Sequence, residues 1–255
     1  MIVSESKWLA WPELRPHARL RLLCLHHAGG AVSAYAHWAR LIRPDTEFLV
    51  VQLPGRENRR SEPPLVESRE VMERLLPHLQ RELRPPYALF GHSMGGLLAF
   101  RLAQRILQSG ELPPPQRLIV SAAPAPDDRG GRRELASLSN EDLVKHLRQH
   151  GGTPEVILSN PQMLAAFLPT LRADLALSAS LAKYQAFDGP VAGLQLSVFR
   201  GADDPASQRQ DAKAWAGSCQ PPTSEHVFAG GHFYYRERLG TVIGVLNSIL
   251  AADLS

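Results

Sequence analysis

The chain has 255 residues, of which 44% are hydrophobic and 21% are charged. This length can bury one sizeable core, and we expect a single domain over residues 1–255 that carries an insertion. The 28 Lys and Arg residues exceed the 25 Asp and Glu residues by only three. A charge this close to balance gives no large positive field, so a nucleic-acid partner is not expected.

The N-terminal segment and the cysteines bear on the cellular compartment. Residues 1–20 mix charges, prolines and tryptophans and lack the apolar stretch of about 7–15 residues that a secretory signal needs. No apolar run approaches the roughly 20 residues that span a bilayer. Two cysteines, Cys24 and Cys219, are too few for a disulfide scaffold. We expect a cytoplasmic monomer without membrane contact.

Apolar runs alternate with helical patterns along most of the chain. In chain order, the patterns predict a strand at 19–27, a helix at 31–42, a strand at 47–53, a helix at 67–83, a strand at 87–90, a helix at 97–107, and strands at 117–123, 194–200 and 226–228. Repeated strand–helix units of this kind predict an α/β fold with a mostly parallel central sheet and helices on both faces.

The β pattern disappears between about residues 134 and 185. Helical patterns occupy this stretch, and glycines and prolines interrupt them. Composition alone allows two interpretations, a helical lid inserted over a site or ordinary helices packed on the sheet.

The motif G-x-S-x-G occurs at residues 91–95, between a predicted strand and a predicted helix. Its two glycines allow a sharp strand-to-helix turn that presents the hydroxyl of Ser93 above the sheet. A serine between glycines is often only part of a loop, but the flanking strand and helix favour a nucleophile.

A serine nucleophile needs a base, and in a fold of this order the chain should give serine, acid and then histidine. His232 follows the short predicted strand at 226–228 and is the histidine after Ser93 with that setting. His146 and His150 have helical i, i+4 spacing, but no third metal ligand accompanies them. A solvated helix face explains that pair better, and neither a metal nor another cofactor is expected.

The acid should follow the preceding strand, where Asp203 and Asp204 stand side by side. One carboxylate is enough to hold the imidazole in its productive tautomer. Asp127 and Asp128, after the strand at 117–123, are weaker alternatives that could simply end a turn.

Attack on an acyl carbon creates an oxyanion, which backbone N–H groups must stabilise. The amide that follows the nucleophile belongs to Met94, and a second donor should come from the loop after an early strand. That loop contains Ala28, Gly29 and Gly30, and we assign the second donor to Ala28.

Six motifs, spread from about residue 22 to residue 250, resemble those of type II thioesterases associated with non-ribosomal peptide and polyketide synthases. They are HHAGGAVSAYAHW near the start, VQLPGRENR around Pro54, GHSMGG around Ser93, LRAD at 171–174, GADDP at 201–205 and GGHFYY at 230–235. HAGG, PGR and GGHF in this order are more specific than GHSxGG, which many hydrolases share. The chain departs from the family in having His26 and His27 where an aromatic residue or cysteine followed by Pro or His is more usual.

The resemblance implies an α/β-hydrolase fold and hydrolysis of misprimed or stalled acyl groups from the phosphopantetheine arm of acyl or peptidyl carrier proteins. It implies that Ser93, Asp204 and His232 form the catalytic triad. Of the two interpretations of residues 134–185, it favours the lid. Arg56, Arg59 and Arg60 either contact the carrier protein or form ion pairs inside the domain.

Three rival functions follow from the same residues. An esterase would use this chemistry on small molecules, and an acyltransferase would replace water by an alcohol or amine. A non-catalytic hydrolase fold that only binds carrier domains would not need the serine, acid and histidine together.

Overall fold

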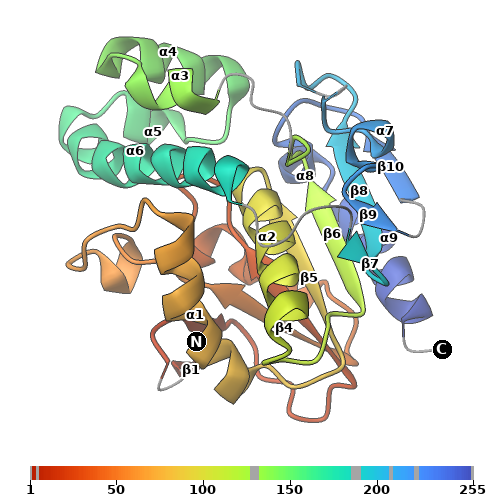
Figure 1. Cartoon of the computed structure of the whole chain (residues 1–255). Helices are drawn as coiled ribbons and strands as arrows, with labels where there is room; N and C mark the ends of the chain where they lie inside the picture. The colour runs from red at the N-terminus through yellow and green to blue at the C-terminus, as the bar shows by residue number, and fades with distance from the viewer. Residues whose placement is uncertain are drawn as a thin grey trace.

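The central feature of the computed structural model is an eight-stranded sheet with strand order β1-β2-β4-β3-β5-β6-β8-β10 (Figure 1). The model describes residues 2–3, 6–126, 132–184, 191–206, 209–220 and 224–253. The strands are β1 (Ile2–Val3), β2 (Leu9–Trp11), β3 (Leu20–Leu25), β4 (Thr46–Val51), β5 (Tyr87–His92), β6 (Arg117–Ser121), β8 (Gln195–Gly201) and β10 (Ser224–Phe228), with β7 (Val191–Ala192) and β9 (Cys219–Gln220) as a separate pair. All pairs from β4 to β10 are parallel, and β1 and β2 join the edge antiparallel.

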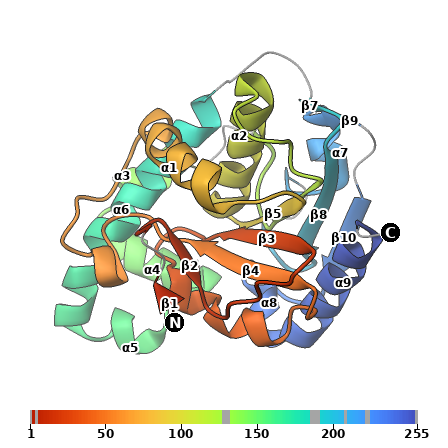
Figure 2. The same ribbon diagram turned by 90° about the horizontal axis from the view of Figure 1, so that it is seen from below.

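Helices cover both faces of the sheet (Figure 2). One face carries α1 (Ser68–Glu82), α2 (Met94–Ser109) and the short α7 (Ala212–Trp215), and the other carries α8 (Tyr234–Glu237) and α9 (Leu239–Ala252). The predicted α/β-hydrolase architecture, a mostly parallel sheet between helices, is therefore confirmed.

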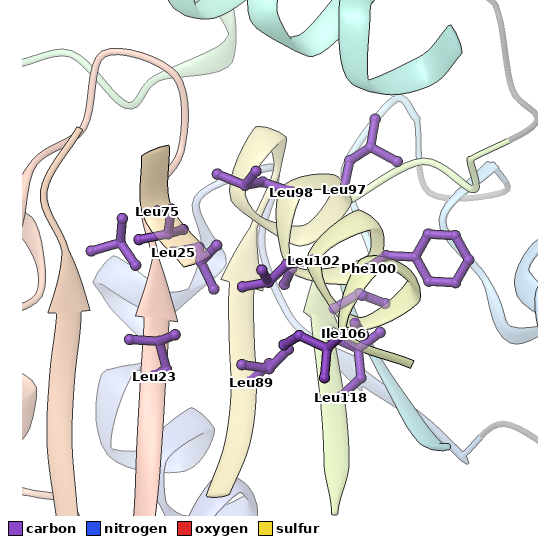
Figure 3. Packing of buried hydrophobic residues seen from close by; sticks show 14 of the residues in the cluster. Leu23, Leu25, Leu75, Leu89, Leu97, Leu98, Phe100, Leu102, Ile106 and Leu118 are labelled. Atoms are coloured by element: carbon purple, nitrogen blue, oxygen red, sulfur yellow. The ribbon is translucent and has the colours of Figure 1, made fainter. Parts of the chain in front are cut away.

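The side chains of the buried strands point alternately to the two faces of the sheet and divide the core into two layers. In β3, Leu23 and Leu25 pack on the face of α1 and α2, whereas Leu22 and Cys24 pack on the face of α9. Successive strand side chains point to opposite faces, so a strand that is apolar throughout requires cover on both sides. Figure 3 shows the first layer, in which leucines of β3, β5 and β6 meet the apolar side of α2.

The structure differs from the sequence prediction at two places near the N-terminus. Residues 31–42 form the 3₁₀ turns η1 (Val32–Ala34) and η2 (Ala36–Arg40) instead of one helix, since the N–H groups of Tyr35 and Trp38 bond to the carbonyls three residues before them, Val32 and Tyr35. The antiparallel edge pair β1 and β2 was not predicted, since a two- or three-residue strand carries almost no periodic signal.

Four helices separate β6 from β8 and lie above the carboxyl ends of the strands (Figure 1). They are α3 (Arg132–Ser137), α4 (Asn140–His150), α5 (Glu155–Leu158) and α6 (Pro161–Lys183). The predicted helical insertion is thus present, while the boundary of the whole domain at 1–255 stays a prediction.

Helix α6 is long and apolar enough to cross a membrane by length and composition alone. The expectation that no stretch approaches this length was too strict. However, α6 packs on α2 and α3 and buries the carboxylate of Asp174, as the core helix of an insertion does.

Candidate active site

Ser93 lies on a strained turn between β5 and α2. Its backbone has φ +56° and ψ −118°, and its N–H donates to the Ser121 carbonyl at 2.7 Å. A Cβ on Gly91 would lie 2.0 Å from the Gly95 oxygen, and a Cβ on Gly95 would lie 2.1 Å from the Leu25 oxygen. Both glycines are therefore required for the turn, and a strained residue in such a setting is typical of a functional site.

Gly95→Ala is expected to prevent stable folding, because the added methyl would overlap the backbone of β3 and not a movable side chain. Overpacking typically costs about 1–3 kcal/mol and more where the neighbour cannot move. Soluble yield and denaturant unfolding measure the effect. Gly244→Ala, in α9 with open space around its Cβ, is the matched control and should unfold at the same or higher denaturant concentration. Equal stability of the two variants would contradict the account of the turn.

The structure brings Ser93, His232 and Asp204 into one line of hydrogen bonds. Ser93 Oγ lies 3.0 Å from His232 Nε2, and His232 Nδ1 lies 2.6 Å from Asp204 Oδ2. Asp204 follows β8 and His232 follows β10, so both come from the same edge of the sheet as Ser93. In the neutral imidazole with its proton on Nδ1, His232 donates to Asp204 and accepts from the serine hydroxyl, as general-base activation requires.

Asp204, not its neighbour Asp203, contacts the imidazole. Asp204 is buried and also accepts hydrogen bonds from Ala206 N and Gln210 Nε2, both at 2.9 Å. Burial alone raises the pKa of Asp204, but the hydrogen bonds, first from His232, outweigh it and lower the pKa to about 2. Asp203 is exposed, and among the described residues its carboxylate accepts a hydrogen bond from Gly230 N alone.

Gln210 was missed from the sequence, since nothing in its local pattern marks it. Asp127 and Asp128, the weaker candidates for the acid, lie outside the described residues.

Ala28 and Met94 border the same cavity as Ser93. Within the described part of the chain, no acceptor takes the N–H of either residue. By contrast, Gly29 N–H donates to the carboxylate of Asp174 at 2.7 Å and Gly30 N–H donates to the His27 carbonyl. The two amides are therefore available to an oxyanion, and their role there stays a prediction.

Three buried histidines surround this centre. His27 and His92 pack edge-on to each other, His92 packs against His232, and His26 directly precedes His27 in the chain. Burial lowers the pKa of His26 to about 3 and lowers the pKa of His27 and His92 well below 6.5. The proton on His26 Nδ1 points to the His27 carbonyl while Nε2 has no partner in the described residues, which fits a neutral ring.

Stability should therefore fall as the pH drops below about 6.5. The histidines of the unfolded chain then bind protons, whereas the buried histidines of the folded protein stay neutral. Each such histidine lowers the free energy of unfolding by about 1.4 kcal/mol per pH unit until the pH reaches its pKa in the folded protein, which is about 3 for His26. Denaturant unfolding at pH 7.5, 6.5 and 5.5 measures the slope, and His26→Asn should reduce it. A free energy of unfolding that is unchanged between pH 7.5 and 5.5 would show that these rings are protonated in the fold.

A cavity of about 520 Å³ opens over Ser93. Its floor includes Ser93 and His232, and its roof comes from the inserted helices. The apolar roof residues are Leu143, Leu147, Ile157, Phe167, Leu171 and Leu175. An apolar cavity with a few convergent polar groups at one end suits an acyl chain attached to a reactive carbonyl.

The two histidines that were weighed as metal ligands lie at this cavity. His146 and His150 stack at 4.0 Å between ring centroids and line the cavity, so they are not merely a solvated face. Among the described residues, no group of three His, Cys, Asp or Glu side chains could hold a metal ion.

The arginines after the PGR turn are mostly internal. Arg56 is buried and pairs with Asp174, and Arg59 is buried, pairs with Glu62 and lies over the ring of Trp8. For these two residues the internal ion-pair interpretation holds, and Arg60 alone remains exposed.

Strand order, strained serine turn, acid and histidine together define a hydrolase of the α/β class. A family model described as the thioesterase domain matches residues 20–250, and the chain belongs to this family of thioester hydrolases. It is 33% identical to the gramicidin S biosynthesis protein GrsT of Aneurinibacillus migulanus, over 92% of this chain and 91% of that one. It is 31% identical to thioesterase PikA5 of Streptomyces venezuelae, over 92% of this chain and 83% of the other.

Solved structures agree with these relatives. The type II thioesterase BorB of the borrelidin biosynthetic cluster is 34% identical and superposes with a TM-score of 0.84 over the whole of both chains. YbtT, a type II thioesterase from the yersiniabactin pathway, is 26% identical with a TM-score of 0.81 over 97% of this chain and all of that one. The sequence-based assignment to type II thioesterases is confirmed.

Proposed function

We propose that Ser93, His232 and Asp204 hydrolyse acyl thioesters carried on the phosphopantetheine arm of acyl or peptidyl carrier proteins. The single observation that carries the proposal is the hydrogen-bonded line from Ser93 Oγ through His232 to Asp204, placed under an apolar cavity. The relatives support the carrier-bound substrate, since YbtT is named as a type II thioesterase of an NRPS/PKS pathway and BorB as one of a biosynthetic cluster.

Acylation is the first half-reaction. His232 Nε2 takes the proton of Ser93 as Oγ attacks the thioester carbonyl, and the amide N–H groups of Ala28 and Met94 stabilise the oxyanion. Collapse of the tetrahedral intermediate breaks the C–S bond, and the pantetheine thiolate takes the proton from His232. Asp204 keeps the imidazole oriented and stabilises its charged form. The hydrogen bonds from Ala206 and Gln210 support this role, because they keep the Asp204 carboxylate ionised.

Deacylation returns the enzyme to its starting state. Water that enters the cavity loses a proton to His232 and attacks the acyl-serine carbonyl, and the Ser93 oxygen leaves with that proton. The net reaction consumes one thioester and one water and produces a carboxylic acid and a thiol.

The test compares three substrates with one acyl group: an acetyl- or propionyl-loaded carrier protein, the matching acyl-pantetheine, and a simple oxygen ester. Loss of the acyl group is followed by intact-protein mass for the carrier and by product acid for the others. The proposal expects the highest kcat/KM with the loaded carrier. Hydrolysis of the simple ester alone would make the protein a small-molecule esterase, transfer of the acyl group to an added alcohol or amine would make it an acyltransferase, and binding of the carrier without hydrolysis would make it a binding module.

A further inference from the structure

A carboxylate on the inserted helix α6 is buried against the loop that holds the proposed oxyanion donor. Asp174 has no exposed surface, and its Oδ2 accepts the N–H of Gly29 at 2.7 Å. Gly29 directly follows Ala28, so this hydrogen bond fixes the peptide next to the one whose N–H should face the reacting oxygen.

The counter-ion of Asp174 comes from a third segment, the turn after β4. Arg56 pairs with both carboxylate oxygens, Nη1 with Oδ2 at 2.7 Å and Nη2 with Oδ1 at 2.8 Å, and Nη1 also donates to the Gly30 carbonyl at 3.0 Å. The remaining guanidinium N–H groups donate to the Pro54 carbonyl. Asp174 and Arg56 therefore bind the same loop at two neighbouring residues. Asp174 accepts the N–H of Gly29, and Arg56 donates to the carbonyl of Gly30.

Side chains of α6 also pack directly against Gly29. Gly29 has φ +72°, and a Cβ there would lie 2.7 Å from the ring of Phe167 and 3.3 Å from Leu171. The helix thus rests directly on the loop backbone, and a shift of α6 would act on Gly29 through both the carboxylate and these side chains.

Fold stability alone does not explain this arrangement. A buried ion pair gains little over an apolar pair of similar volume, because both charges lose their hydration. A carboxylate does, however, give what an apolar side chain cannot, a fixed acceptor for one particular backbone N–H.

We propose that Asp174 is a positioning residue that makes oxyanion stabilisation depend on the seating of α6. When the helix is seated, its carboxylate takes the Gly29 N–H and orients the loop so that the Ala28 N–H faces the carbonyl attacked by Ser93. When the helix lifts, the loop loses that acceptor and the oxyanion site is incomplete. This inference rests on the proposed function, since it concerns the same reaction.

The test uses Asp174→Leu in the full chain, because leucine is of similar size but has no oxygen to accept the Gly29 N–H, with Arg56→Lys as a second variant in case the first folds poorly. Substrate is the acyl-pantetheine, and the concentration of folded enzyme is normalised by labelling Ser93 to completion. We expect kcat to fall about 10- to 100-fold in Asp174→Leu, a part of the 10²–10³ that losing an oxyanion donor costs, and KM to change little. Arg56→Lys keeps the charge but loses the bidentate contact, so its kcat should fall less, in the same direction.

A second readout separates positioning from stability. An alkyl trifluoromethyl ketone forms a tetrahedral adduct with Ser93, and the oxyanion donors stabilise this adduct. The affinity for the ketone should therefore fall by the same factor as kcat/KM. The control is Asp253→Leu, which removes the comparable bidentate pair with Arg117 at the opposite end of the sheet. It should lower the unfolding midpoint but leave kcat and ketone affinity unchanged.

Each outcome is decisive. If Asp174→Leu lowers only the unfolding midpoint, as Asp253→Leu does, the carboxylate is structural and the inference is lost while the proposed function stands. If the wild type hydrolyses neither thioester nor ester, the proposed function fails and the inference fails with it.

Discussion

Ser93→Ala is expected to abolish hydrolysis of the loaded carrier protein, with kcat lowered by about 10⁶, the loss typical of removing the nucleophile from a serine hydrolase. The hydroxyl is the atom that forms the acyl-enzyme, and the alanine leaves His232 with no oxygen to deprotonate. The fold should survive, because His232 is the one hydrogen-bond partner of the Ser93 side chain among the residues that the structure describes, and Ala can adopt the same turn. Intact-protein mass of the carrier, taken over time, measures the loss.

The control for this variant lies on the same helix. Ser109 is at the far end of α2, where its hydroxyl caps the Ile106 carbonyl. Ser109→Ala should hydrolyse the carrier at the wild-type rate. More than about one part in a thousand of wild-type activity in Ser93→Ala would point to another nucleophile, because the residual catalysis without a triad is far below that level.

The sequence predicted the parts of the site that local chemistry marks. The glycines around Ser93 predict a turn that other residues cannot form. Asp204 follows an apolar strand and His232 follows a short strand, in the expected chain order. Parallel strands bring their carboxyl ends to one edge, so residues that follow β5, β8 and β10 must gather there. That rule could not choose between Asp203 and Asp204 on spacing alone, and the choice came from the resemblance to type II thioesterases.

The contacts that the sequence could not predict join segments with no fixed register. Arg56 and Asp174 stand in two of the quoted motifs, yet nothing in either motif says that a loop after β4 and a helix of the insertion meet at Gly29. The role of the arginines was left open for the same reason. Gln210 contacts Asp204 from six residues away through a loop whose path depends on packing.

Asp204→Asn is expected to lower kcat by about 10⁴ with little change in KM. The asparagine keeps the size of the side chain, but its amide can donate to His232 Nδ1 and then stabilises the tautomer whose proton faces Ser93. The charge that stabilises the imidazolium is also lost. Steady-state hydrolysis of acyl-pantetheine, with folded enzyme counted by near-ultraviolet circular dichroism, measures both constants.

Asp203→Asn is the matched control for this change, because it alters the neighbouring carboxylate and leaves the imidazole untouched. Asp203 is exposed, and within the described ranges of the chain its carboxylate accepts just the N–H of Gly230, two residues before His232. An asparagine oxygen can keep that hydrogen bond, so kcat should stay within about threefold of the wild type, as for a surface change that costs little. If instead Asp203→Asn lost the activity and Asp204→Asn kept it, the acid would be Asp203. In that case His232 would pair with Asp203 during acylation, and not with Asp204 as in this structure.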